Sequence, residues 1–131
     1  MFRVATLFAV LSLAAPAHAT VYDCKINADS GDQGWISKDY VFDHDSTANS
    51  VSVVDDVIQY FLRKPLAGKV SDDTSRKLVF SWTVQAKDDR GNLFAMQYRA
   101  AWFKGPKTMT VTAIPPGYAN NFDARGTCTV K

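Results

Sequence analysis

The sequence contains no glutamate, and all 13 of its acidic residues are aspartates. Glutamate favours helix interiors, whereas aspartate favours turns and helix caps. Several aspartates come in pairs at places where turns would fall, as in Asp55-Asp56, Asp72-Asp73 and Asp88-Asp89. This pattern argues against a mainly helical fold and predicts a β-rich one with regularly spaced turns.

Histidine and cysteine are scarce. The histidines are His18 and His44, and the cysteines are Cys24 and Cys128. With so few of these side chains the sequence offers no CxxC zinc motif and no multi-histidine metal site, and it offers no Cys–His nucleophile pair if the cysteines are bonded to each other. We therefore expect a protein that is not an enzyme and has no cofactor or metal.

The chain also lacks a large excess of charge of either sign. The formal net charge is +2, and no basic run exceeds two residues. A balanced chain without a basic patch argues against a dedicated nucleic-acid surface. The expected partner is instead a protein or a small molecule.

Residues 1–19 have the three parts of a secretory signal peptide. Arg3 supplies a positive start, an apolar run extends from Val4 to Ala15, and Ala17-His18-Ala19 matches a cleavage site. The run is shorter than the roughly 20 apolar residues of a spanning helix. We expect residues 20–131 to form a single β domain that is periplasmic or secreted and has no membrane span.

Cys24 and Cys128 lie just inside the two ends of that domain. An exported chain meets an oxidising environment, so we expect the two cysteines to form a disulfide that ties the first strand to the last. A bond closing so long a loop is worth roughly 4–5 kcal/mol in the chain-entropy model.

Alternating apolar and polar residues predict antiparallel strands along most of the domain. The strongest pattern is a long hairpin, Leu78–Ala86 and Phe94–Trp102, with a turn at Asp88–Asn92. The other strands are expected at 22–26, 35–42, 51–54, 109–113 and 125–130, with polar connections at 44–50 and 68–75. Residues 55–66 fit a short helix or a strand. The sum is an all-β fold of seven or eight strands, either a small antiparallel barrel or a sandwich.

Aromatic residues offer the best candidates for binding. Phe80, Trp82, Tyr98 and Trp102 share one face of the hairpin, and this face could line a cavity, although packed core is the favoured interpretation. The candidates for a ligand or partner surface are one of these residues, Trp102, and five more: Trp35, Lys104, Tyr118, Asn120 and Phe122.

Asp43-His44-Asp45 is the most reactive-looking trio. An imidazole between two carboxylates could titrate near neutral pH or bind a metal. The spacing Asp43-x-Asp45-x-Thr47-x-Asn49 loosely resembles a calcium loop, but Ala48 stands where that loop has its glycine and no glutamate closes the site. The favoured interpretation is therefore a polar turn between strands.

Three sets of residues carry a resemblance to known proteins: Tyr98-Arg99-Ala100, Val53-x-Asp55-x-x-Ile58 and Met109-x-Val111-x-Ala113-x-Pro115-x-Gly117-Tyr118-x-Asn120-x-Phe122-x-Ala124-Arg125-Gly126-x-Cys128. In these residues the chain resembles a family of small secreted alphaproteobacterial proteins of unknown activity, which implies a periplasmic setting.

Three shorter motifs carry a second resemblance: Tyr22-x-Cys24, Trp102-x-Lys104-Gly105 and Cys128. They are similar to motifs of periplasmic inhibitors of c-type lysozyme, which are small antiparallel barrels. The Ser/Gly-rich enzyme-contacting segment of those inhibitors is replaced here by Phe94–Ala101.

Three functions follow as hypotheses. The favoured one is a non-enzymatic periplasmic binding or accessory domain, because catalytic side chains are so few. The second is an inhibitor of a cell-wall hydrolase, and the third is an enzyme that uses aspartates and His44.

Overall fold

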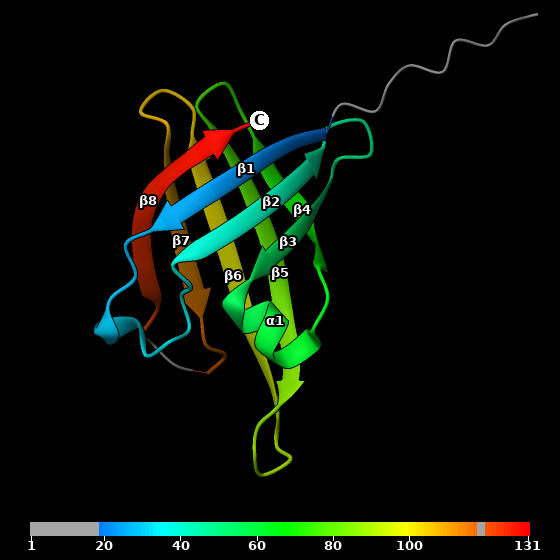
Figure 1. The fold of residues 1–131 in the computed structure, drawn as a ribbon, viewed down its shortest axis with the longest axis vertical. Helices are drawn as coiled ribbons and strands as arrows, with labels where there is room; N and C mark the ends of the chain where they lie inside the picture. Colours follow the sequence, from blue (N-terminus) through cyan, green and yellow to red (C-terminus); the bar gives the residue numbers. More distant parts are fainter. Residues whose placement is uncertain (1–18, 118–119) are drawn as a thin grey trace, which may run out of the picture.

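The computed structural model describes residues 19–117 and 120–131, which form a closed antiparallel barrel of eight strands (Figure 1). Each strand pairs with the next along the chain, and β8 pairs with β1 to close the sheet. The strands are β1 (Ala19–Ile26), β2 (Asp39–Asp45), β3 (Ser50–Asp55), β4 (Leu66–Asp73), β5 (Lys77–Lys87), β6 (Leu93–Phe103), β7 (Thr108–Ile114) and β8 (Phe122–Val130). A 3₁₀ turn, η1 (Ser30–Asp32), and one helix, α1 (Asp56–Leu62), complete the fold.

The expected all-β fold with a short helix is confirmed, and the choice between barrel and sandwich is settled as a barrel. The open question over residues 55–66 is settled by α1. Asp55 has extended backbone and its side chain accepts a hydrogen bond from the Ile58 amide at 2.8 Å, which is the geometry of a helix N-cap.

One predicted connection is wrong. Residues 68–75 were expected to be a polar link, yet most of them belong to β4. Half-buried residues alternate with exposed ones along this strand, but its inward side includes Gly68 and Asp72 as well as Leu66 and Val70. A glycine and an aspartate weaken the apolar period by which a strand is recognised from sequence.

The strand predicted at 35–42 is displaced. β2 begins only at Asp39 and continues to Asp45, so the turn after it is shorter than predicted. Asp45 forms that turn, because its carboxylate accepts hydrogen bonds from the amides of Thr47 at 2.9 Å and Ala48 at 3.1 Å. Residues 35–38, including Trp35, therefore lie in the long connection that carries η1.

The barrel closes between β1 and β8, and the predicted disulfide lies in this pairing. Cys24 is opposite Cys128 in the strand register, and the two are bonded. The strands approach closely there: a Cβ on Gly126 would lie 1.8 Å from the Lys25 carbonyl oxygen, so only glycine fits. The first and last strands are thus held by covalent and backbone contacts together.

Aromatic rings fill the barrel. Phe80, Trp82, Tyr98 and Trp102 are all buried, and the rings of Trp82 and Tyr98 stack with centroids 5.3 Å apart. Tyr40 and Phe42 from β2 stack at 5.7 Å and continue the layer. The predicted aromatic face is therefore packed core, and a ligand inside the barrel would have to displace it.

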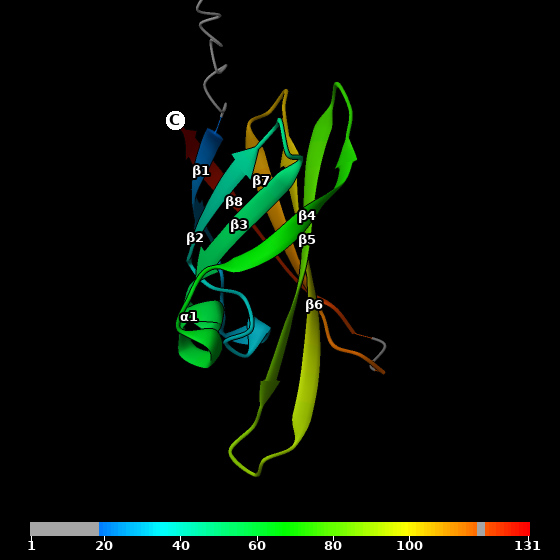
Figure 2. The same ribbon diagram turned by 90° about the vertical axis from the view of Figure 1, so that its right-hand side faces the viewer.

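The β5–β6 hairpin is longer than the strands beside it. β4 pairs with β5 only as far as Ser81, and β7 pairs with β6 only between Gln97 and Phe103. The two long strands continue to pair with each other as far as Lys87 and Leu93. Figure 2 shows the hairpin projecting past the rest of the barrel, at the end that carries α1.

Candidate functional site

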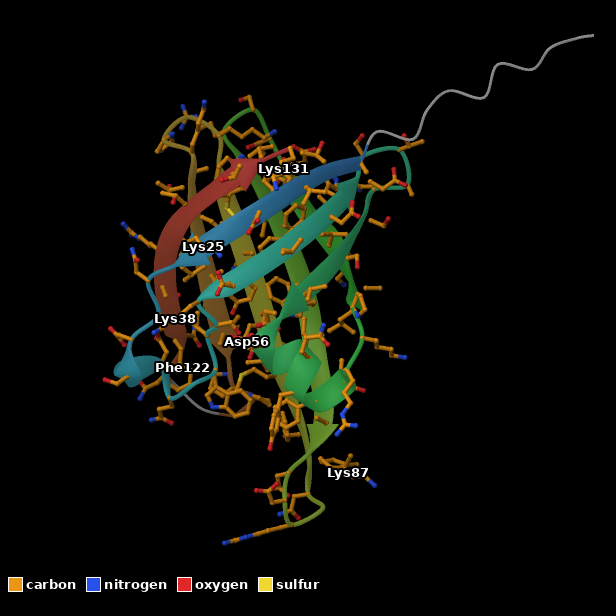
Figure 3. All side chains as sticks on the ribbon, in the orientation of Figure 1. Lys25, Lys38, Asp56, Lys87, Phe122 and Lys131 are labelled. Atoms are coloured by element: carbon orange, nitrogen blue, oxygen red, sulfur yellow. A yellow bond between two sulfur atoms is a disulfide. The ribbon has the colours of Figure 1, made fainter. Side chains whose placement is uncertain are left out.

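An open groove of about 1010 Å³ lies at the α1 end of the barrel. Its lining comes from the η1 connection, α1, the projecting hairpin, Pro115 and Pro116 after β7, Asn120, and Phe122 at the start of β8. Figure 3 labels one residue from several of these elements, and Phe122, Asp56 and Lys87 all lie at this end of the molecule. A groove of this size accommodates a small organic ligand.

Four aromatic rings in mutual contact form one wall of the groove. Trp35 stacks on Phe61 with centroids 6.4 Å apart and meets the edge of Phe94 at 5.6 Å. Phe61 makes edge-to-face contacts with Phe94 at 5.2 Å and with Tyr60 at 4.8 Å. We call these four residues the aromatic cluster. They come from three separate elements, so the tertiary fold alone assembles them.

Part of this wall is exposed. Tyr60 is 72% exposed, and Leu93, which lines the same groove, is 78% exposed. Large apolar side chains left open at the rim of a hollow are characteristic of binding surfaces. Phe122 from β8 lines the same groove, together with Pro115 and Pro116.

A buried hydrogen-bond network holds the Trp35 segment against the barrel. The Tyr98 hydroxyl donates to the Trp35 carbonyl at 2.9 Å, and the Ser37 amide donates to the Tyr40 hydroxyl at 3.0 Å. The Ser37 hydroxyl donates to the Asp55 carboxylate at 2.8 Å. Because Asp55 also caps α1, one carboxylate joins the two elements that supply Trp35 and Phe61.

Burial changes the acid–base behaviour of this network. Asp55 is 4% exposed, and desolvation raises the pKa of its carboxyl above the ordinary 3.8, against the opposing effect of the hydrogen bonds from Ile58 and Ser37. Burial also raises the pKa of the Tyr40 and Tyr98 hydroxyls, and the nearby Asp55 charge adds to this. Both phenols therefore stay protonated and keep their hydrogen bonds at neutral pH.

The polar lining of the groove is acidic or neutral. Gln33, Asp88, Asp89 and Asn120 contribute to it. Asp88 and Asp89 belong to the tip of the hairpin, where the predicted turn is confirmed: the Asp88 amide donates to the Asn92 carbonyl at 2.9 Å and Gly91 has a φ of 79°.

The sequence-predicted surface residues separate into two groups. Trp35, Asn120 and Phe122 meet in the groove. Trp102 is instead 6% exposed in the core, and Lys104 lies in the turn between β6 and β7. There Lys104 donates to Asp73 and to the Thr74 carbonyl, at 2.8 and 2.6 Å. Tyr118 lies outside the described residues.

Sequence reasoning missed Tyr60, Phe61 and Phe94 as site residues. Phe94 continues the inward-facing series of β6, so by pattern it matches the core residues beyond it. The positions of Tyr60 and Phe61 could not be predicted, because residues 55–66 fitted a strand as well as a helix. One signal was present: Phe61 follows Ile58 at helical spacing, which places an aromatic ring beside the buried face of a capped helix.

The Asp43-His44-Asp45 trio does not converge. His44 points into the barrel, is 6% exposed, and has its ring 5.5 Å from that of Phe80, while Asp43 is exposed. Across residues 19–117 and 120–131, no group of three or more His, Cys, Asp or Glu side chains is placed to hold a metal ion. Nor does any helix in these ranges have the length and apolar character needed to cross a membrane.

Comparisons with known proteins give no match: none is found to a protein-family model, to a curated protein or to a solved structure.

Proposed function

We propose that this protein is a non-enzymatic binding domain of the periplasm or the extracellular space, and that it holds an apolar ligand in the groove at the α1 end. The observation that carries the proposal is the half-open aromatic cluster, in which Tyr60 is exposed and which shares the groove with the exposed Leu93. Support for the location is the Cys24–Cys128 disulfide, a bond that persists in oxidising compartments.

The contrast between the packed barrel interior and the open groove supports a binding role. The interior is packed, so it acts as a rigid scaffold, and the groove lies where the barrel pairing ends. A preformed apolar wall reduces the entropy cost of binding because few side chains need to be ordered. The network around Asp55 fixes Trp35 and α1 in advance of any ligand.

The test is a titration with N-phenyl-1-naphthylamine, an uncharged aromatic dye that fluoresces in apolar surroundings. We expect saturable binding to the native protein that weakens at least fivefold in Tyr60→Ser. Phe103→Ser is the matched control, because Phe103 is also an exposed aromatic residue but belongs to the other end of β6. Absence of saturable binding, or equal losses in the two variants, would rule out the groove as the site.

A second candidate is an inhibitor of a cell-wall hydrolase, and the projecting β5–β6 hairpin favours it. Its tip, residues 88–92, is exposed on an extension that could enter an enzyme cleft (Figure 2). The Lys104 turn that carries part of the resemblance to lysozyme inhibitors is engaged with Asp73 and Thr74. Unchanged activity of a c-type lysozyme in excess protein would remove this candidate.

A further inference from the structure

Charge is distributed unevenly around the groove. The chain has 15 lysines and arginines against 13 aspartates. The described lining nevertheless includes Asp88 and Asp89 and no lysine, arginine or histidine. Lys87 and Arg90 flank these two aspartates in the sequence but are not among the described lining residues, so the charged side chains of the described lining are complementary to a cation.

Asp88 is held in place by its own turn. Its Oδ1 accepts hydrogen bonds from the amides of Arg90 at 2.9 Å and Asn92 at 2.8 Å. These bonds lower the pKa of the Asp88 carboxyl, so it stays ionised over a wide pH range. The negative charge is thus fixed at the rim of the groove.

The two carboxylates are not used in the ion pairs of the fold. Within the described part of the chain, the ion pairs are Lys25–Asp39, Lys77–Asp72 and Lys104–Asp73. None of them involves the hairpin tip. The charge of Asp88 and Asp89 therefore has no cationic partner among these pairs and is available to a ligand.

The aromatic cluster is a second feature of the groove that attracts a cation. The face of an aromatic ring carries a negative quadrupole, and a cation above it is stabilised, most strongly over tryptophan. The cluster offers several such faces together, because ring contacts join all four of its residues: Trp35, Tyr60, Phe61 and Phe94. Aromatic rings and carboxylates line the same groove, and this combination suits a substituted ammonium group, which is apolar on its surface and positive in charge.

We propose that the ligand of this groove is an organic ammonium cation, in which the positive group meets Asp88, Asp89 and the aromatic cluster. This inference rests on the proposed function, because it names the ligand class for the same site. A neutral apolar ligand would use the rings but not the carboxylates, and an anion would be repelled.

The experiment compares choline with 3,3-dimethylbutan-1-ol, which has the same shape and no charge. Amide and indole NMR shifts of the native protein are followed during titration. Trp82 and Trp102 are buried, so the Trp35 indole reports on the groove. We expect choline to bind about tenfold more tightly than the alcohol, and the preference to shrink as ionic strength rises.

Variants assign the preference to the carboxylates. Asp88→Asn combined with Asp89→Asn removes the charge, and asparagine can keep the turn because its side-chain oxygen accepts the same amide bonds. We expect the preference for choline to disappear. Asp45→Asn is the matched control, because Asp45 accepts two turn amides in the same way in the loop between β2 and β3.

The outcomes separate the two proposals. Equal affinity for choline and the alcohol, or a preference that survives the double substitution, would overturn the cation assignment while binding of the uncharged dye upholds the groove. If neither the dye nor either small probe perturbs groove residues, both proposals are wrong.

Discussion

The barrel interior and the groove are built from the same strand face, yet one is sealed and the other is open. Trp102, Tyr98 and Phe94 all face the same side of β6, spaced four residues apart. Trp102 and Tyr98 lie where strands pair on both sides, and both are buried. Phe94 lies beyond the end of the β7 pairing, so its ring meets Trp35 and Phe61 at a half-open wall. Closure by neighbouring strands, and not residue type, decides whether an aromatic ring becomes core or site.

The largest effect is expected from removing the closure itself. Replacing both cysteines, Cys24→Ser with Cys128→Ser, should lower the free energy of unfolding by about 4–5 kcal/mol, because the bond closes a loop of 104 residues. Urea unfolding measures the loss. At temperatures where the variant stays folded, the uncharged dye should bind as in the native protein. A loss below about 1 kcal/mol would mean that strand pairing alone closes the barrel.

Next comes the interior. Trp82→Ala should cost about 3–5 kcal/mol of unfolding free energy, because Trp82 is 4% exposed and stacks against Tyr98, so its removal leaves a cavity. Its midpoint in urea should fall with little change in slope. If the loss were as small as that of a surface residue, the sealed interior described above would be incorrect.

The link between the two regions should respond to pH. The folded state holds the Asp55 proton more tightly than the unfolded chain, because burial raises its pKa above 3.8. The contribution of Asp55 to the free energy of unfolding should therefore fall as pH rises from 3.8 to the raised pKa, by about 1.4 kcal/mol for each unit of pKa difference, and stay level on either side.

Asp55→Asn isolates this effect. Asparagine keeps the cap on α1 and does not titrate, so the variant should lack this fall with pH. Urea unfolding of both proteins between pH 3 and 7 gives the comparison. A native protein that gains stability over the variant as pH rises would contradict the direction of the shift.

The smallest effect on stability is expected from a substitution in the exposed wall of the groove. Tyr60→Ser should change the free energy of unfolding by less than about 0.5 kcal/mol, since 72% of Tyr60 is already exposed. The same substitution is expected to weaken dye binding severalfold. A variant that binds less but is equally stable marks a residue used for binding and not for folding.

The sequence alone predicted the all-β class and its main landmarks, while the choice of a barrel came from the structure. The alternation along β5 and β6, the aspartate turns and the two near-terminal cysteines predicted an antiparallel body, its long hairpin and its disulfide, and all three are present. These features are local or depend on one pairing, so their physical causes can be read in short stretches. β4 was missed for the same reason, because Gly68 and Asp72 interrupt its apolar period.

The tertiary structure decided the site. Alternation says which residues share a face, but it carries no information on how far a neighbouring strand extends, and this extent opens the groove beside Phe94. Whether Asp55 begins a helix or ends a strand, and hence whether Phe61 meets Trp35, depends on contacts between segments far apart in the chain. The sequence determined which side chains are available to the wall, and strand length and packing decided that they form a wall and not a core.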